Sequence, residues 1–84
     1  EIENSLNERI NIFPNPTKTN INIKLANTEN YMIIEIYDLK GQIVMKNEIS
    51  KNNNKINIKS LNKGIYILSV YGKNTFYKQK FIVQ

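Results

Sequence analysis

The residues of this sequence that could carry acid–base chemistry are its carboxylates, because the chain contains no histidine and no cysteine. Histidine is the usual general base near neutral pH and the commonest metal ligand, and cysteine supplies thiolate nucleophiles and zinc ligands. The carboxylates are Glu1, Glu3, Glu8, Glu29, Glu35, Asp38 and Glu48. A glycosidase needs two carboxyl groups about 5 to 10 Å apart beside a cleft. Glu35 and Glu48 could meet across a hairpin, but their alternating positions favour cross-strand ion pairs with lysine, so we expect no enzyme activity.

We expect no cofactor and no metal site either. Calcium sites need several clustered oxygen ligands, and this chain has a single aspartate, Asp38. A serine nucleophile would lack a histidine to activate it. The glycines Gly41, Gly64 and Gly72 are isolated, so they form no phosphate-binding loop.

The aromatic residues leave one binding function open. Exposed tyrosine rings can stack on sugars, and a cluster of Tyr31, Tyr71 and Tyr77 on one sheet face would favour this. The alternative hypothesis is therefore a carbohydrate-binding or adhesive β-sandwich module of a secreted protein.

The charge of the chain is basic but dispersed. The net charge is +5, and Arg9 is the single arginine among twelve basic residues. Nucleic-acid readers rely on arginine for bidentate contacts, so no nucleic-acid partner is expected. The scattered lysines indicate a solvated surface, and a specific anionic partner remains the alternative. No run approaches the roughly 18 apolar residues of a transmembrane segment.

Short strands separated by turn residues must position these side chains. Period-two alternation and β-branched content predict strands at 10–13, 20–25, 31–37, 42–49, around Ile56 and Ile58, at 65–71 and at 75–83. The side chains expected to face the core are Ile21, Ile23, Leu25, Met32, Ile34, Ile36, Ile43, Met45, Ile49, Tyr66, Leu68 and Val70. Residues 10–13 run into Pro14-Asn15-Pro16, which predicts an edge strand ending at a rigid corner. Asp38 and Gly41 suit a tight turn that joins two strands into a hairpin.

Together these strands predict an all-β fold, a small seven-stranded immunoglobulin-like antiparallel β-sandwich. Residues 1–9 are polar and without pattern, and we interpret them as a linker from a preceding cargo domain. Residues 10–84 then form one domain.

Four segments of the chain carry a family resemblance. They are Ile12-Phe13-Pro14-Asn15-Pro16-Thr17, Ile36-Tyr37-Asp38-Leu39-Lys40-Gly41-Gln42-Ile43-Val44, Leu61-Asn62-Lys63-Gly64-Ile65-Tyr66 with the strand after it, and Lys80-Phe81-Ile82-Val83. In this order and spacing they resemble the C-terminal sorting domain of type IX secretion system cargo, the type A family. One departure is visible at Lys18-Thr19-Asn20, where the family often has glycine.

The resemblance implies a secretion and sorting signal that directs a cargo protein across the outer membrane. It implies a route through the periplasm to the cell surface or the medium, and removal of the domain by a sortase-like peptidase. The implied partners are the outer-membrane translocon, a shuttle protein and the sortase. The matched sorting-motif residues are Pro14, Asn15, Pro16, Tyr37, Asp38, Gly41, Gly64, Tyr66, Lys80, Phe81, Ile82 and Val83.

Among these residues, the terminal motif Lys80–Val83 is the strongest candidate for direct recognition. An exposed edge of its strand could accept a partner strand, and edge strands also make a dimer possible. Cleavage is expected near or before residues 1–9.

Overall fold

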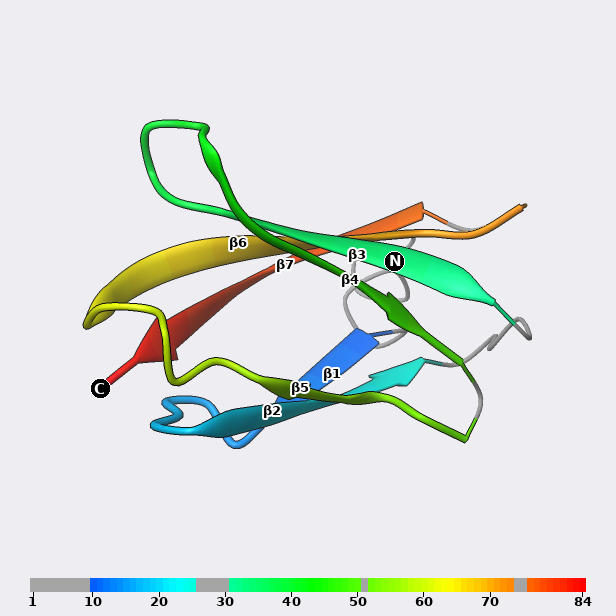
Figure 1. Cartoon of the computed structure of the whole chain (residues 1–84), viewed down its shortest axis with the longest axis horizontal. Coiled ribbons are helices and arrows are strands. Elements are labelled where there is room, and N and C mark those ends of the chain that lie inside the picture. The colour runs from blue at the N-terminus through cyan, green and yellow to red at the C-terminus, as the bar shows by residue number, and fades with distance from the viewer. Residues whose placement is uncertain (1–9, 26–30, 51, 74–75) are drawn as a thin grey trace, which may run out of the picture.

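The protein is a β-sandwich built from two antiparallel sheets packed face to face (Figure 1). The computed structural model describes residues 10–25, 31–50, 52–73 and 76–84. The expected linker at 1–9 and the carboxylates Glu1, Glu3, Glu8 and Glu29 lie outside the described residues. None of the described residues belongs to a helix with the length and apolar character needed to cross a membrane.

Seven strands make up the two sheets. The strands are β1 (Ile10–Phe13), β2 (Asn20–Leu25), β3 (Met32–Tyr37), β4 (Ile43–Ile49), β5 (Lys55–Asn57), β6 (Gly64–Tyr71) and β7 (Phe76–Val83). One sheet has the order β1-β2-β5 and the other has the order β4-β3-β6-β7. The fold class expected from the sequence is therefore confirmed, and β1 is an edge strand as its neighbouring prolines predict.

The core lies between the sheets and consists almost entirely of aliphatic side chains. Its central members are fully buried and come from both layers: Ile21, Ile56 and Ile58 from one side, and Ile34, Ile36, Leu68, Val70 and Phe81 from the other. Strict alternation along β2 and β3 places their apolar residues inward and their polar residues outward. This burial is the main stabilising contribution in a domain that has no disulfide and no cysteine.

One expected core residue is on the wrong face. Ile43 was predicted to point inward, but 52% of its surface is exposed. The register of β3 and β4 shifts by one residue, because Ile36 pairs with Met45 while Tyr37 pairs with Ile43. The extra residue, Val44, forms a bulge. Ile43, which precedes it in β4, therefore points to the opposite face from the one that strict alternation predicts. Met45 is half-buried against the core and Ile49 is buried, as predicted.

A buried hydroxyl in β6 gives a test of how the core is stabilised. Ser69 is fully buried, and its Oγ has no hydrogen-bond partner among the described residues. Since an unpaired buried hydroxyl costs about 1 to 3 kcal/mol, we expect Ser69→Ala to keep or raise the free energy of unfolding. The matched control is its neighbour Leu68→Ala, which should lower the free energy of unfolding by about 2 to 5 kcal/mol through the cavity it leaves. Chemical denaturation measures both, and a clear loss of stability in Ser69→Ala would show that the hydroxyl is paired.

Candidate recognition site at the proline corner and the last strand

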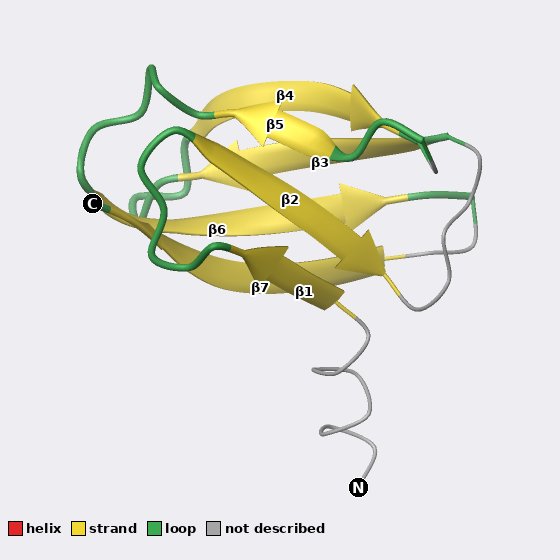
Figure 2. Ribbon diagram, turned by 90° about the horizontal axis from the view of Figure 1, so that it is seen from below, coloured by secondary structure: helices red, strands yellow, loops and turns green. Residues whose placement is uncertain are grey.

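The first feature of the site is a corner between β1 and β2 at which the chain reaches across to the other sheet. The chain leaves β1 at Phe13 and turns through Pro14, Asn15 and Pro16, whose side chains are exposed. Directly after the corner, Thr17 forms a parallel bridge with Val83 of β7. The corner therefore carries the chain from the edge of the three-stranded sheet to the edge of the other sheet, where β1 and β7 also touch (Figure 2).

Three hydrogen bonds fasten this corner to the end of β7 and to Gln84, and a fourth braces the corner itself. The Thr17 N–H donates to the Ile82 carbonyl at 2.9 Å, and the Gln84 N–H donates to the Thr17 carbonyl at 2.8 Å. The Ile82 N–H donates to Oδ1 of Asn15 at 2.9 Å, although the two residues lie 67 positions apart. The Thr17 hydroxyl donates to the Asn20 carbonyl at 2.5 Å, and Thr17 itself is buried. The proline motif and the terminal motif are thus one structural unit.

The glycine–tyrosine motif supports this unit from β6. Gly64 pairs with Val83, and Tyr66 pairs with Phe81, so both motif residues lie beside the terminal motif. The rings of Tyr66 and Phe81 stack with centroids 5.9 Å apart, and the Tyr66 hydroxyl donates to the Asn62 carbonyl at 2.8 Å. Gly64 has φ 155°, a backbone angle that residues with a side chain rarely adopt.

The terminal motif divides into two pairs of side chains. Phe81 and Val83 point into the core and are buried, whereas Lys80 and Ile82 are exposed. A partner protein can therefore touch Lys80 and Ile82 directly. Phe81 and Val83 can affect binding of a partner only indirectly, by holding the backbone of β7 in place.

A depression of about 460 Å³ lies beside the corner. Its walls are Pro14, Pro16, Thr17, Lys18, Thr19, Asn20, Asn22, Lys55 and Gln84. Two of its lining residues, Lys18 and Lys55, are basic.

The hairpin motif lies at the same end of the sandwich. Because β3 and β7 are both antiparallel to β6, the ends of β3 and β7 meet the beginning of β6 there. In the turn, the Gly41 N–H donates to the Asp38 carbonyl at 3.0 Å, and Gly41 has φ 87°. The Asp38 carboxylate accepts the N–H groups of Lys40 at 2.9 Å and Gln42 at 3.0 Å, so Asp38 builds the turn, as expected.

A second, smaller depression of about 320 Å³ opens beside this turn on the outer sheet face. It is lined by Tyr37, Asp38, Leu39, Gly41, Ile67 and Lys78. Tyr37, Ile67 and Lys80 are successive register partners across β3, β6 and β7. The hairpin motif is therefore two strands away from the terminal motif on one continuous face.

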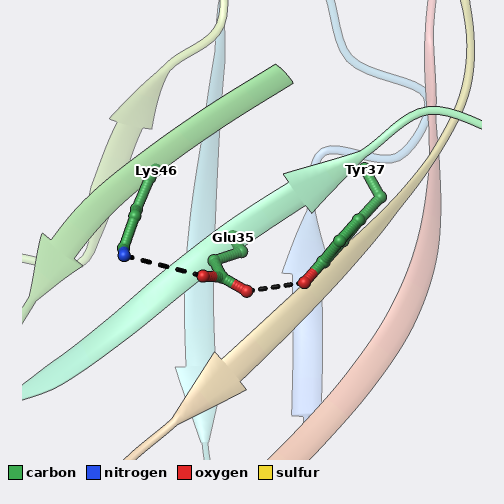
Figure 3. A network of polar contacts seen from close by, with 3 residues as sticks. All are labelled: Glu35, Tyr37 and Lys46. Atoms are coloured by element: carbon green, nitrogen blue, oxygen red, sulfur yellow. Dashed lines mark hydrogen bonds and ion pairs between the residues drawn. The ribbon is translucent and has the colours of Figure 1, made fainter. Parts of the chain in front are cut away.

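The outer face of this sheet also carries a polar network around Glu35 (Figure 3). The Tyr37 hydroxyl donates to Oε1 of Glu35 at 2.6 Å, and Nζ of Lys46 lies 3.8 Å from Oε2. The hydrogen bond from Tyr37 is the main reason that the pKa of Glu35 falls below its ordinary 4.5, against a smaller opposing effect of desolvation. The same bond raises the pKa of Tyr37. Glu35 is thus an ionised, paired carboxylate, which is the opposite of a general acid with a raised pKa.

The expected cross-strand pairing of Glu35 with lysine is confirmed, since Lys46 is also its register partner. Glu48 instead stands opposite Ile33 and accepts a hydrogen bond from Tyr31 at 2.9 Å. The tyrosine cluster considered for sugar binding does not form. Tyr77 is buried on the inner face, whereas Tyr71 is on the outer face, where it packs against Phe76 with ring centroids 5.2 Å apart.

Thr17 was not among the residues predicted to be functional. It holds the centre of the corner, because both of its backbone groups and its hydroxyl are used in hydrogen bonds. The available signal was its place directly after Pro14-Asn15-Pro16, where the backbone must find partners outside a regular strand.

Comparison with known proteins finds one protein family and several relatives that match most of this chain. The model of one protein family, described as a secretion system C-terminal sorting domain, matches residues 11–84. Beta-agarase A of Zobellia galactanivorans is 36% identical over 87% of this chain, but the match covers only 13% of the agarase. An endo-acting ulvan lyase of Formosa agariphila is 32% identical over 89% of this chain and is matched over 15% of its own length. The chain therefore spans only a small part of these relatives.

The bond between Asn15 and Ile82 can be tested by removing its acceptor. We expect Asn15→Ala to lower the free energy of unfolding by about 1 kcal/mol, the usual contribution of one hydrogen bond. Amide hydrogen exchange at Ile82 should accelerate, because that N–H would lose its partner. Asn11→Ala, which truncates an exposed amide on β1, is the matched control and should leave Ile82 unchanged. Equal rates of amide hydrogen exchange at Ile82 in the wild type and in Asn15→Ala would show that this hydrogen bond does not protect the Ile82 N–H.

The network around Glu35 predicts an acid-dependent stability. Because its folded pKa is lowered, ionised Glu35 stabilises the fold above its ordinary pKa of 4.5, and this stabilisation is lost as the pH falls through the folded pKa. Tyr37→Phe removes the largest cause of the shift, so the pKa of Glu35 should rise toward 4.5. Carboxyl titration by NMR measures this directly. Tyr31→Phe, which removes the bond to Glu48, is the control and should leave Glu35 as it is.

Proposed function

Since this chain belongs to the family of secretion system C-terminal sorting domains, we propose that the export machinery contacts its proline corner and the end of β7. The domain is a type IX sorting signal, and it directs export to the cell surface or the extracellular space. Its family is one of sorting domains rather than of catalytic domains. The activity of the protein that carries it is a separate matter, because the relatives are matched over only 13% and 15% of their length.

The observation that carries this proposal is the set of hydrogen bonds between the proline corner and β7. Thr17 and Asn15 bind the backbone of Ile82, so two motifs from opposite ends of the domain present one surface. An address made in this way exists only in the folded domain, because unfolding separates the two motifs.

The motif residues have two different roles in the proposed site. Phe81, Val83 and Tyr66 are buried and hold β7 in place, so they act on recognition through position. The exposed side chains of Pro14, Asn15, Pro16, Lys80 and Ile82 make the contacts. Tyr37, Asp38 and Gly41 shape the hairpin at the same end and extend the surface across the sheet.

The finer partner assignments are part of the same proposal. The outer-membrane translocon and its shuttle protein bind the folded domain, and a sortase-like peptidase then removes it. The cut lies near or before residues 1–9, upstream of β1, so that the folded domain leaves as one piece. Support comes from the family membership of residues 11–84.

An export assay in a host with a type IX system tests the contact surface. The reporter is a periplasmic fluorescent protein followed by residues 1–84. We expect Ile82→Ser to reduce surface or medium delivery by about tenfold, because it replaces apolar surface that binding would remove from water with a hydroxyl. Thermal unfolding of the isolated domain should change little, since Ile82 is partly exposed in the folded state.

The matched control is Val44→Ser, which alters an aliphatic side chain of the same exposed fraction on β4, far across the sheet. It should be exported like the unaltered domain. Equal export of Ile82→Ser and Val44→Ser, with both domains folded, would place the contact surface elsewhere.

A further inference from the structure

The open part of the β7 edge is the strongest unassigned feature of the molecule. β7 is the edge strand of its sheet, and among the described strands it pairs with β6 alone there. The backbone groups of Ile82 point away from β6, since they bond to Asn15 and Thr17 of the corner. In an antiparallel ladder this direction repeats every second residue. The backbone groups of Phe76, Lys78 and Lys80 therefore point to the same outer edge.

The described residues leave most of this edge unpaired. The corner reaches Ile82 and Gln84 and no further along β7. In the stretch before Ile82, the Lys80 carbonyl accepts one long bond of 3.3 Å from the Gln79 side chain, and the described residues supply no other hydrogen bond. Within the described part of the chain, the outward backbone groups along Phe76–Lys80 are therefore left for a further strand, although β1 of the other sheet touches β7.

The side chains along this edge set the chemistry of what can bind. Phe76, Lys78 and Lys80 are all exposed, and Nζ of Lys78 lies 5.9 Å from the centre of the Phe76 ring. β7 carries no carboxylate. The described acidic residues, Glu35, Asp38 and Glu48, belong to β3, β4 and the turn between them. The sheet is therefore basic along its β7 edge and acidic only on its opposite half.

We propose that this edge takes up an extended acidic segment of an export-machinery protein as an additional strand of the sheet. The inference rests on the proposed function, and it names the chemistry of the partner at the same site. The segment places carboxylates at alternate positions opposite Lys78 and Lys80, where cross-strand ion pairs form. Main-chain hydrogen bonds supply affinity, and the charges supply selectivity.

The same lysines work against a second copy of this chain. Two β7 edges in contact would bring lysines close to lysines, and like charges on neighbouring strands are destabilising. Edge lysines commonly protect a sheet from pairing with itself. The same lysines attract an acidic partner strand. The charges that disfavour pairing with a second copy of this chain therefore favour the acidic partner.

The proline corner limits where the added strand can lie. Asn15 and Thr17 occupy the outward groups of Ile82, so a partner strand must end before that residue. The exposed Ile82 side chain and the corner then lie directly beyond the end of the partner strand. The corner thereby sets the register of the partner against Lys78 and Lys80.

The test measures peptide binding to the isotope-labelled chain of residues 1–84 by NMR. The peptide has eight residues, alternates glutamate with valine and has blocked ends, and the control peptide replaces each glutamate with lysine. We expect the glutamate peptide to shift the amide signals of Phe76, Lys78 and Lys80, and the lysine peptide to bind at least about tenfold more weakly. Equal binding of both peptides, or shifts confined to β4, would overturn the proposal.

Two variants separate the backbone contribution from the charge contribution. Lys78→Pro removes an outward N–H while the β6 ladder keeps its hydrogen bonds, and it should abolish binding of the glutamate peptide. Lys78→Ala keeps that N–H and should weaken binding only about threefold to tenfold, as loss of one charge pair would. Circular dichroism checks that both variants fold, and peptide binding by folded Lys78→Pro as tight as by the unaltered chain would refute strand addition.

The export assay distinguishes this inference from the proposed function. Loss of export in Ile82→Ser with no peptide binding at the β7 edge would reject the acidic strand and keep the corner as the contact surface. Peptide binding at the edge together with unchanged export in Ile82→Ser and in the charge reversal Lys80→Glu would reject the proposed contact surface. Sedimentation of the unaltered chain gives a further check, because a stable dimer broken by Lys78→Pro would assign the edge to a second copy.

Discussion

The structure depends on the docking of one short corner onto the end of the last strand. Residues before and after Thr17 belong to the three-stranded sheet, yet Thr17 itself bonds to β7 of the other sheet. A sandwich without disulfides has few ways to tie its two layers together apart from side-chain packing. Here the backbone supplies such a tie at one end. Because its bonds link residues far apart in sequence, the tie forms only when both sheets are in place.

The positions of the motifs follow from this constraint and from antiparallel pairing. The end of β3, the start of β6 and the end of β7 meet at one end of the sheet, and the corner closes the same end. Segments spread over the whole sequence are therefore gathered into one region. The glycines Gly41 and Gly64 are found there because the backbone has a positive φ at both. A sorting signal distributed in sequence is thus compact in space.

Local patterns predicted the strands well, and failures occurred where long-range geometry decides. Alternation placed Ile21, Ile34 and Leu68 in the core, because burial on one face imposes a period of two. Ile43 was misplaced, since a bulge depends on how two strands pair and leaves no mark in either strand alone. The bond between Asn15 and Ile82 could not be predicted, because no local pattern relates residues 67 positions apart. The motif residues came from resemblance, and the structure adds which of them are exposed.

The same strand contributes to folding and to recognition in this domain. The exposed fraction of each side chain shows which of the two roles that residue serves. Phe81 is fully buried, so selection on its identity acts through the core and through the position of β7. Lys80 and Ile82 alternate with it on the outer face, where the fold places little demand on their chemistry. A strand with one face fixed by packing and one free face can keep its fold while its outer residues match a partner. The outer face of β7 can therefore carry recognition residues with little effect on stability, provided that the corner holds β7 in register.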